Sequence, residues 1–402
     1  MASHTTMPRR SLLTGSAAAL AGVGLATWGR GAHAQAAAAK PLPAAVSWKN
    51  PADVIVHSAS TVETKRSAFG TGAITPSNQL YLRNNLPTPD ASIVADRDAW
   101  EVNVTGVKNP RKLTLRELKA MGLETVTMVL QCSGNGRAFF PSKPSGTQWT
   151  VGAAGCVVWS GVPMRAVVEA LGGVVEGMRY MTSTGGEKLP DGIDPKSIIV
   201  ERSVAAAARQ DAMLAWEMNG EPIPLAHGGP LRMIVPGFQG VNNIKYVKQV
   251  AFTENESDAK IMSHGYRLAP LGGKGDPSMP SVQEMGVKSW INSPLPEDGT
   301  LTAGGVVQIF GVAFGGVHAV KGVEVSIDGG KTWQQARFIG PDLGKYAWRQ
   351  FALAARLPAG NHMLVSRATD TAGNTQPEAR VENLRGYNNT SWADHAVTVT
   401  VA

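Results

Sequence analysis

The sequence of 402 residues predicts an α+β protein of mainly β structure, with two domains in series. Glycine makes up 45 of the 402 residues, about 11% against a usual share of about 7%, which favours turns over long helices. The candidate helices and strands are short and show no repeating βαβ rhythm, so a doubly wound sheet is not expected. Beyond residue 290, roughly 100 residues of short alternating strands are typical of an immunoglobulin-like β-sandwich.

The first 34 residues predict a twin-arginine signal peptide. The paired Arg9 and Arg10 precede a weakly apolar stretch, and Ala32-His33-Ala34 has the small-x-small pattern of a cleavage site. Loss of this segment would remove three arginines and no acid, so the formal charge would fall from +7 to +4 (7 − 3). We therefore expect a periplasmic protein that is exported folded. The modest charge, without a dense Lys/Arg run, argues against nucleic acid as a partner, and no segment predicts a membrane anchor.

The mature chain divides into an extended Ala/Pro-rich segment at 35–52, a mixed domain at 53–290 and an all-β domain at 291–402. In the mixed domain we expect strands at Trp100–Val104, Thr125–Leu130 and Leu231–Val235. Helices are expected at Thr114–Met121, where Thr114 and Glu117 form a capping box, at Met164–Leu171 and at Ser203–Met213.

The all-β domain follows a predicted linker at Ser293–Pro296. Val323, Val325 and Ile327 alternate with polar residues, and Asp328-Gly329-Gly330 is typical of a hairpin turn. The same alternation returns at 397–401, close to the end of the sequence. These features predict the sandwich.

Cys132 is the candidate reactive residue, in the stretch Gln131-Cys132-Ser133-Gly134-Asn135-Gly136-Arg137. A thiol at a strand end, followed by glycines and an arginine, favours the thiolate, which binds soft metals. The alternative is a disulfide with Cys156, which an oxidising compartment permits. The sequence has no Cys-x-x-Cys-His, no histidine pair at ligand spacing and no nucleotide-binding glycine loop, so covalent heme, zinc and nucleotide sites lack support.

The stretch 130–137 resembles the molybdenum centre of the sulfite oxidase family, in particular that of bacterial periplasmic heme-free sulfite dehydrogenases. Other stretches that match the family in order are 81–84, 148–149, 152–162, 215–220, 227–237, 243–245, 264–266, 325–333 and 383–386. The resemblance covers residues 81 to about 400 and implies a molybdopterin-binding catalytic domain followed by a dimerisation domain.

The resemblance implies one molybdenum–molybdopterin cofactor per chain, and no heme. Cys132 ligates the metal, which removes it from disulfide formation and leaves Cys156 as a buried hydrophobe. The matching cofactor-binding positions are Asn84, Asn85, His227, Arg232, Asn243, Ile244 and Lys245.

By the same resemblance, a small sulfur oxyanion binds among Arg83, Arg137 and Arg385, with Trp149 as a wall and Tyr266 as a hydroxyl donor. Arginine suits this task because its planar fork matches an oxyanion. Two departures stand out: Asn85 replaces a histidine of the family pattern, and Gly136 replaces a larger residue, from which we expect a wider pocket. Segment 181–203 matches poorly, so no contact is assigned there.

The implied function is oxidation of sulfite to sulfate, with electrons passed singly to an external c-type cytochrome, in a homodimer. The alternatives are a molybdenum subunit that oxidises protein-bound sulfane sulfur in thiosulfate metabolism, and a secreted non-catalytic binding protein.

Overall fold

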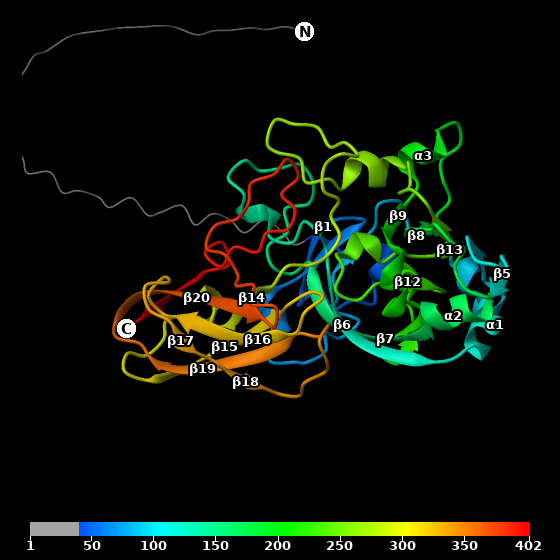
Figure 1. Ribbon diagram of the computed structural model, residues 1–402. Coiled ribbons are helices and arrows are strands. Elements are labelled where there is room, and N and C mark those ends of the chain that lie inside the picture. The colour runs from blue at the N-terminus through cyan, green and yellow to red at the C-terminus, as the bar shows by residue number, and fades with distance from the viewer. Residues whose placement is uncertain (1–39) are drawn as a thin grey trace, which may run out of the picture. The chain divides into compact units, whose positions relative to one another are not determined.

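Figure 1 shows the computed structural model, which describes residues 40–402. The predicted signal peptide and residues 35–39 lie outside this range. Among the described residues, no helix is long and apolar enough to cross a membrane. Residues 44–52 are not extended as predicted. They form a 3₁₀ helix (Ala44–Val46) and turns that bury Val46 completely.

The catalytic region holds three sheets. The smallest has the order β1 (Val54–Ser58), β2 (Thr61–Thr64) and β3 (Leu82–Arg83). The second has the order β11 (Glu221–Pro222), β10 (Met213–Met218), β7 (Ala154–Pro163) and β6 (Glu124–Gln131), with β12 (Arg232–Ile234) also paired to β10. The third has the order β5 (Arg111–Thr114), β4 (Glu101–Thr105), β13 (Val247–Thr253), β8 (Tyr180–Gly185) and β9 (Glu201–Ala205).

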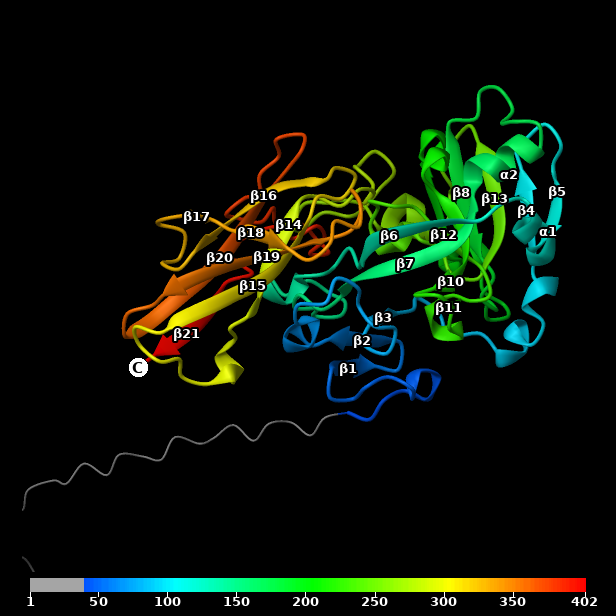
Figure 2. The same ribbon diagram turned by 90° about the horizontal axis from the view of Figure 1, so that it is seen from below.

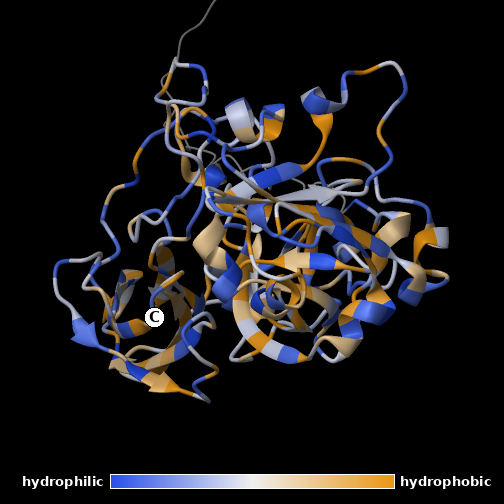
Figure 3. Cartoon of the chain, turned by 45° about the vertical axis from the view of Figure 1, so that its right-hand side comes forward, coloured by the Kyte–Doolittle hydropathy of each residue, from blue (hydrophilic) through white to orange (hydrophobic). Residues whose placement is uncertain are grey.

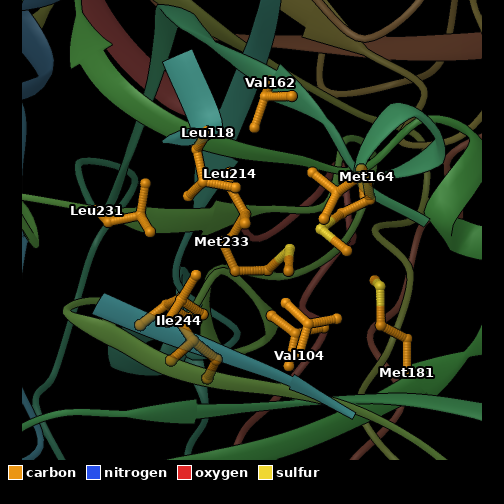
Figure 4. Close-up of a cluster of buried hydrophobic side chains, with 14 of the residues drawn as sticks. Val104, Leu118, Val162, Met164, Met181, Leu214, Leu231, Met233 and Ile244 are labelled. Carbon is orange, nitrogen blue, oxygen red and sulfur yellow. The ribbon is translucent and has the colours of Figure 1, made fainter. Parts of the chain in front are cut away.

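The core of the catalytic region lies between the second and third sheets. Figure 4 shows Val162, Leu214 and Met233 of the second sheet close to Val104 and Met181 of the third. All five side chains are almost inaccessible to solvent. In Figure 3 the hydrophobic residues concentrate on these central strands. This is expected because each sheet buries one apolar face against the other sheet.

The helices are few and short, as the sequence predicts. α1 (Leu115–Ala120) begins at the predicted capping box, and α2 (Met164–Ala170) matches its predicted range. α3 (Pro195–Ile198) is a single turn. The helix predicted at 203–213 is wrong. Residues up to Ala205 pair with β8, Ala206–Gln210 form a 3₁₀ helix, and β10 begins at Met213.

The C-terminal region is a sandwich of two four-stranded sheets. One has the order β14 (Lys288–Ser293), β15 (Val306–Phe314), β19 (Arg349–Arg356) and β18 (Arg337–Ile339). The other has the order β17 (Gln334–Gln335), β16 (Val320–Ser326), β20 (Gly360–Asp370) and β21 (Val397–Val401). β21 alternates strictly between buried and exposed residues, and Asp328 accepts hydrogen bonds from Lys331 and Thr332 in the predicted hairpin turn. Because β14 pairs with β15, the sandwich begins a few residues before the predicted linker.

The two regions share a buried interface. Val129 of β6 and Cys156 of β7 pack in one cluster with Trp290 of β14 and Val312 of β15. Figure 2 shows β6 and β7 as the strands that extend towards the sandwich. The predicted architecture, a mainly β mixed domain followed by an immunoglobulin-like sandwich, is confirmed.

Candidate active site

Cys132 lies directly after β6, on a loop that the surrounding chain holds in place. Its backbone N–H donates to Ala153 O (2.9 Å), and Asn135 Oδ1 accepts from the Ala153 N–H (3.1 Å). Lys288 of β14 donates to Asn135 O (3.3 Å). A Cβ on Gly134 would lie 2.2 Å from the Arg137 guanidinium, so glycine lets that side chain fold back over the loop. The motif thus presents the thiol at a fixed position, 9% exposed.

Two cavities meet at Cys132. Both are lined by Arg83, Asn84, Asn85, Cys132 and Tyr266. The first is a narrow cleft of about 60 Å³. All seven predicted cofactor-binding residues line it: Asn84, Asn85, His227, Arg232, Asn243, Ile244 and Lys245.

The cleft holds buried cations whose hydrogen bonds go to neutral groups. Arg232 donates to the carbonyls of Asn243 (3.2 Å) and His227 (2.9 Å), and Lys245 donates to Asn84 Oδ1 and to Ala226 O (2.7 Å). Burial lowers the pKa of Arg232 to about 10. Burial, and then the nearby Arg232, lower the pKa of Lys245 well below its usual range. An anion in the cleft would offset both effects.

His227 is a neutral member of this group. Burial, followed by the charges of Lys49, Lys245 and Arg232, holds its pKa well below its usual range. Its Nε2 lies 3.3 Å from the Nζ of Lys49, which is itself 3% exposed and donates to Leu80 O (2.5 Å) and Ser77 O (3.1 Å). When Lys49 is protonated its ammonium can only donate, so Nε2 is then the acceptor and Nδ1 carries the ring proton.

The sequence did not identify Lys49 or Glu187 as site residues. Lys49 comes from the segment predicted to be extended, where a single lysine gives no signal of burial. Glu187 lies in the poorly matching segment 181–203 and, among residues 40–402, is the only carboxylate that lines the cleft. Burial raises its pKa to about 7, although a backbone hydrogen bond and Lys245 oppose the rise.

The second cavity has a volume of about 450 Å³ and opens to solvent. The predicted residues Arg83, Arg137, Arg385 and Tyr266 line it, and no Asp or Glu does so among the described residues. Trp149 lines neither cavity. It is fully buried, edge-on to Tyr81 with ring centroids 6.3 Å apart, and therefore supports the cleft from behind.

The three arginines differ in how many of their guanidinium N–H donors already have a hydrogen-bond partner. Arg137 donates to the carbonyls of Arg385 (2.7 Å) and Thr147 (2.8 Å), and Arg385 donates to Ser145 Oγ (2.6 Å). The Arg83 side chain makes no hydrogen bond within residues 40–402, although it lines both cavities. Arg83 is thus the guanidinium with all its donors available to a bound anion.

Tyr266 belongs to a stack of four side chains. Its ring is parallel to that of Tyr387, with centroids 5.1 Å apart and 12° between the planes. Arg137 lies over the outer face of Tyr387 at 5.5 Å, and Arg202 lies 5.6 Å from the Tyr266 centroid. The Tyr387 hydroxyl donates to Gly265 O (3.2 Å). Sequence reasoning missed Tyr387, which lines the second cavity.

Two further predictions concern the Cys132 loop. Gly136 does not widen either cavity, because its missing side chain points at Asn389, 3.0 Å from the ideal Cβ, and its φ of +93° favours glycine. Cys132 and Cys156 are both free thiols, and burial raises the pKa of Cys156 to about 12. The disulfide alternative is therefore absent from the structure.

The residues fit a molybdopterin cofactor. A soft thiolate donor stands at the junction of the cavities, and the cleft beside it carries cations without an acidic hydrogen-bond partner, as a phosphate-bearing group requires. Cys132 would hold the metal, and Arg232, Lys245 and His227 would hold the phosphate-bearing part. The fold and this site define a molybdopterin-binding oxidoreductase.

The comparisons with known proteins agree. Residues 86–261 match the oxidoreductase molybdopterin binding domain, and residues 279–401 match the Mo-co oxidoreductase dimerisation domain. The chain is 33% identical over 351 residues to mitochondrial sulfite oxidase of Macaca fascicularis (82% of this chain, 62% of that protein). It is 31% identical over 359 residues to sulfite oxidase of Arabidopsis thaliana (82% of this chain, 89% of that protein). The chain belongs to the sulfite oxidase family.

Other relatives carry names that refer to reactions other than sulfite oxidation. An inducible nitrate reductase [NADH] of Glycine max is 32% identical over 349 residues, which is 39% of its length. The solved structure of the sulfane dehydrogenase SoxCD from Paracoccus pantotrophus has a TM-score of 0.71 and covers 86% of this chain and 88% of that one. At 24% identity, this likeness shows the fold.

Proposed function

We propose that the protein oxidises sulfite to sulfate at a mononuclear molybdenum centre held by Cys132. One observation carries the proposal: Cys132 and Tyr266 lie where a cation-lined cleft meets a second cavity that has three arginines and no carboxylate from the described part of the chain. The balanced reaction is SO₃²⁻ + H₂O → SO₄²⁻ + 2 H⁺ + 2 e⁻. When bound, the molybdenum cofactor supplies oxygen-atom transfer and accepts the two electrons.

The chain's own residues bind and orient the anion. Arg83 offers a complete guanidinium fork, while Arg137 and Arg385 add positive charge from fixed positions. The Tyr266 hydroxyl makes no hydrogen bond within the described chain and can donate one to an oxygen at the junction. Preorganised donors of this kind stabilise negative charge without rearranging during the reaction.

We further propose a periplasmic homodimer without heme, exported folded, that passes electrons one at a time to an external c-type cytochrome. The proposal is supported by the sequence pattern of residues 1–34 and by the match of residues 279–401 to a dimerisation domain.

Steady-state turnover tests the function. The purified holoprotein should reduce ferricyanide or cytochrome c with sulfite, and Cys132→Ala should abolish this. Full molybdenum loading without sulfite turnover would refute the proposal.

The second candidate is oxidation of protein-bound sulfane sulfur. The volume and openness of the second cavity favour it, because a cysteine-borne sulfur needs room for its carrier. Activity with thiosulfate and a sulfur-carrying protein, but none with free sulfite, would establish it instead.

A further inference from the structure

The second cavity is larger than sulfite requires. Its volume of about 450 Å³, part of which is open to solvent, is many times the roughly 10–15 Å³ that one water molecule needs on the same measure. Sulfite has only four heavy atoms. If its sulfur sits at the junction beside Cys132 and Tyr266, most of the cavity remains unfilled.

The unfilled part is lined with hydroxyl groups. Ser58 and Ser60 come from the β1–β2 turn, and Ser58 Oγ lies 2.7 Å from the hydroxyl of Thr61, across from Arg83 in the β2–β3 register. On the other side, Ser145 accepts from Arg385, which has no carboxylate partner within residues 40–402. Such walls suit a polar or anionic substituent and disfavour a cation.

The reaction requires a sulfur lone pair and anionic oxygens near Arg83. An organic sulfinate, R–SO₂⁻, keeps both, because one oxygen of sulfite is replaced by carbon. We propose that this cavity also admits small sulfinates whose substituent ends in a carboxylate or hydroxyl, and that the protein oxidises them to sulfonates. The inference rests on the oxygen-transfer activity proposed above.

The step balances as R–SO₂⁻ + H₂O → R–SO₃⁻ + 2 H⁺ + 2 e⁻. One S–O bond forms, the C–S bond is kept, and the sulfur loses two electrons. These leave to the external one-electron acceptor that serves sulfite, ferricyanide in the assay. The substituent lies among Ser58, Ser60 and Arg385, so its charge sets the rate.

The test uses the holoprotein with three probes: 3-sulfinopropanoate, methanesulfinate and 2-aminoethanesulfinate. Ferricyanide reduction is measured against sulfite, with enzyme-free blanks subtracted. We expect kcat/KM to be at least tenfold higher for 3-sulfinopropanoate than for 2-aminoethanesulfinate, since a charge-assisted hydrogen bond is gained in one case and a like charge is met in the other. Methanesulfinate should fall between them.

Two variants locate the effect. Ser58→Leu fills the hydroxyl-lined part and should lower kcat/KM for 3-sulfinopropanoate at least tenfold more than for sulfite. Ser92→Leu, the same change at an exposed residue that lines neither cavity, is the matched control. Calorimetry gives a readout besides activity: the product analogue 3-sulfopropanoate should bind the native chain, and Ser58→Leu should weaken that binding about tenfold.

The outcomes separate the two proposals. Turnover of sulfite without any turnover of sulfinates overturns this inference and leaves the proposed function standing. No turnover of either by loaded protein overturns both. If the rates of sulfinate oxidation change neither with the charge of the substituent nor with Ser58→Leu, the substituent does not bind in this cavity and that assignment is overturned.

Discussion

Lys49→Met is the most informative single substitution, because Lys49 is a buried charge with no acidic partner. Its ammonium is 3% exposed, donates to Ser77 O and Leu80 O, and lies 3.3 Å from His227 Nε2. Burial lowers its pKa from 10.5 to about 7. The difference corresponds to roughly 5 kcal/mol, at about 1.36 kcal/mol for each pH unit.

The sign of the pH dependence follows from proton linkage. Below pH 7 the lysine is charged in both the folded and the unfolded chain, so its burial lowers the free energy of unfolding by that amount. Between about 7 and 10.5 the unfolded chain binds a proton that the folded chain does not. The free energy of unfolding therefore rises with pH, by about 1.4 kcal/mol per unit, and Lys49→Met removes this slope.

Urea unfolding of the cofactor-free chain between pH 6 and 9 measures the effect. The stability of the native chain minus that of Lys49→Met should be flat below pH 7 and gain about 2–3 kcal/mol by pH 9. Lys40→Met is the control, since Lys40 is exposed and its one hydrogen bond to the described residues goes to His57 O. Parallel stability profiles for the native chain and Lys49→Met would refute the reasoning. A pH dependence in the stability of the native chain minus that of Lys40→Met would do so as well, because both chains keep Lys49.

Three other substitutions test the site. Cys132→Ala should lower molybdenum content more than tenfold, whereas Cys156→Ala should keep it, as metal analysis of purified protein can show. Tyr387→Leu removes the aromatic ring stacked on Tyr266 and should lower kcat/KM about tenfold. Tyr387→Phe keeps the ring and should lower kcat/KM only slightly. Equal losses in the two variants would contradict a stacking role. Arg83→Lys should raise KM about tenfold without changing molybdenum content, because an ammonium lacks the guanidinium fork; an unchanged KM would place the anion elsewhere.

Much of the fold followed from local patterns. β21 and the hairpin after β16 form where alternation and Asp328-Gly329-Gly330 predict them, and α1 starts at its capping box. The helix predicted at 203–213 failed because helix propensity, although highest for alanine, differs by less than about 1 kcal/mol per residue between ordinary residues, and strand pairing with β8 overrides it. Ser203 lies opposite Thr182 of β8, and their hydroxyls are 2.7 Å apart.

The residues implied for the cofactor lie together more completely than those implied for the anion, because Trp149 lines neither cavity. The seven residues implied by the family pattern line one cleft, since that pattern is a set of contiguous stretches. The sequence did not identify Lys49, Glu187 and Tyr387 because the residues next to them form no motif that indicates a site. Each becomes part of the site only when a distant segment folds over it, as when Lys49 reaches His227 across 178 positions of the chain.

Tyr387 also changes what the C-terminal domain contributes. Residues 279–401 match a domain described by dimerisation, yet this range supplies Arg385 and Tyr387 to the second cavity. Arg385 O accepts from Arg137 (2.7 Å), so a guanidinium of the Cys132 loop is fixed by the same segment. The contacts from Arg137 through Tyr387 to Tyr266 then join the two domains beside the second cavity. Docking of the sandwich is therefore a condition for a complete anion cavity, independent of whether it also pairs two subunits.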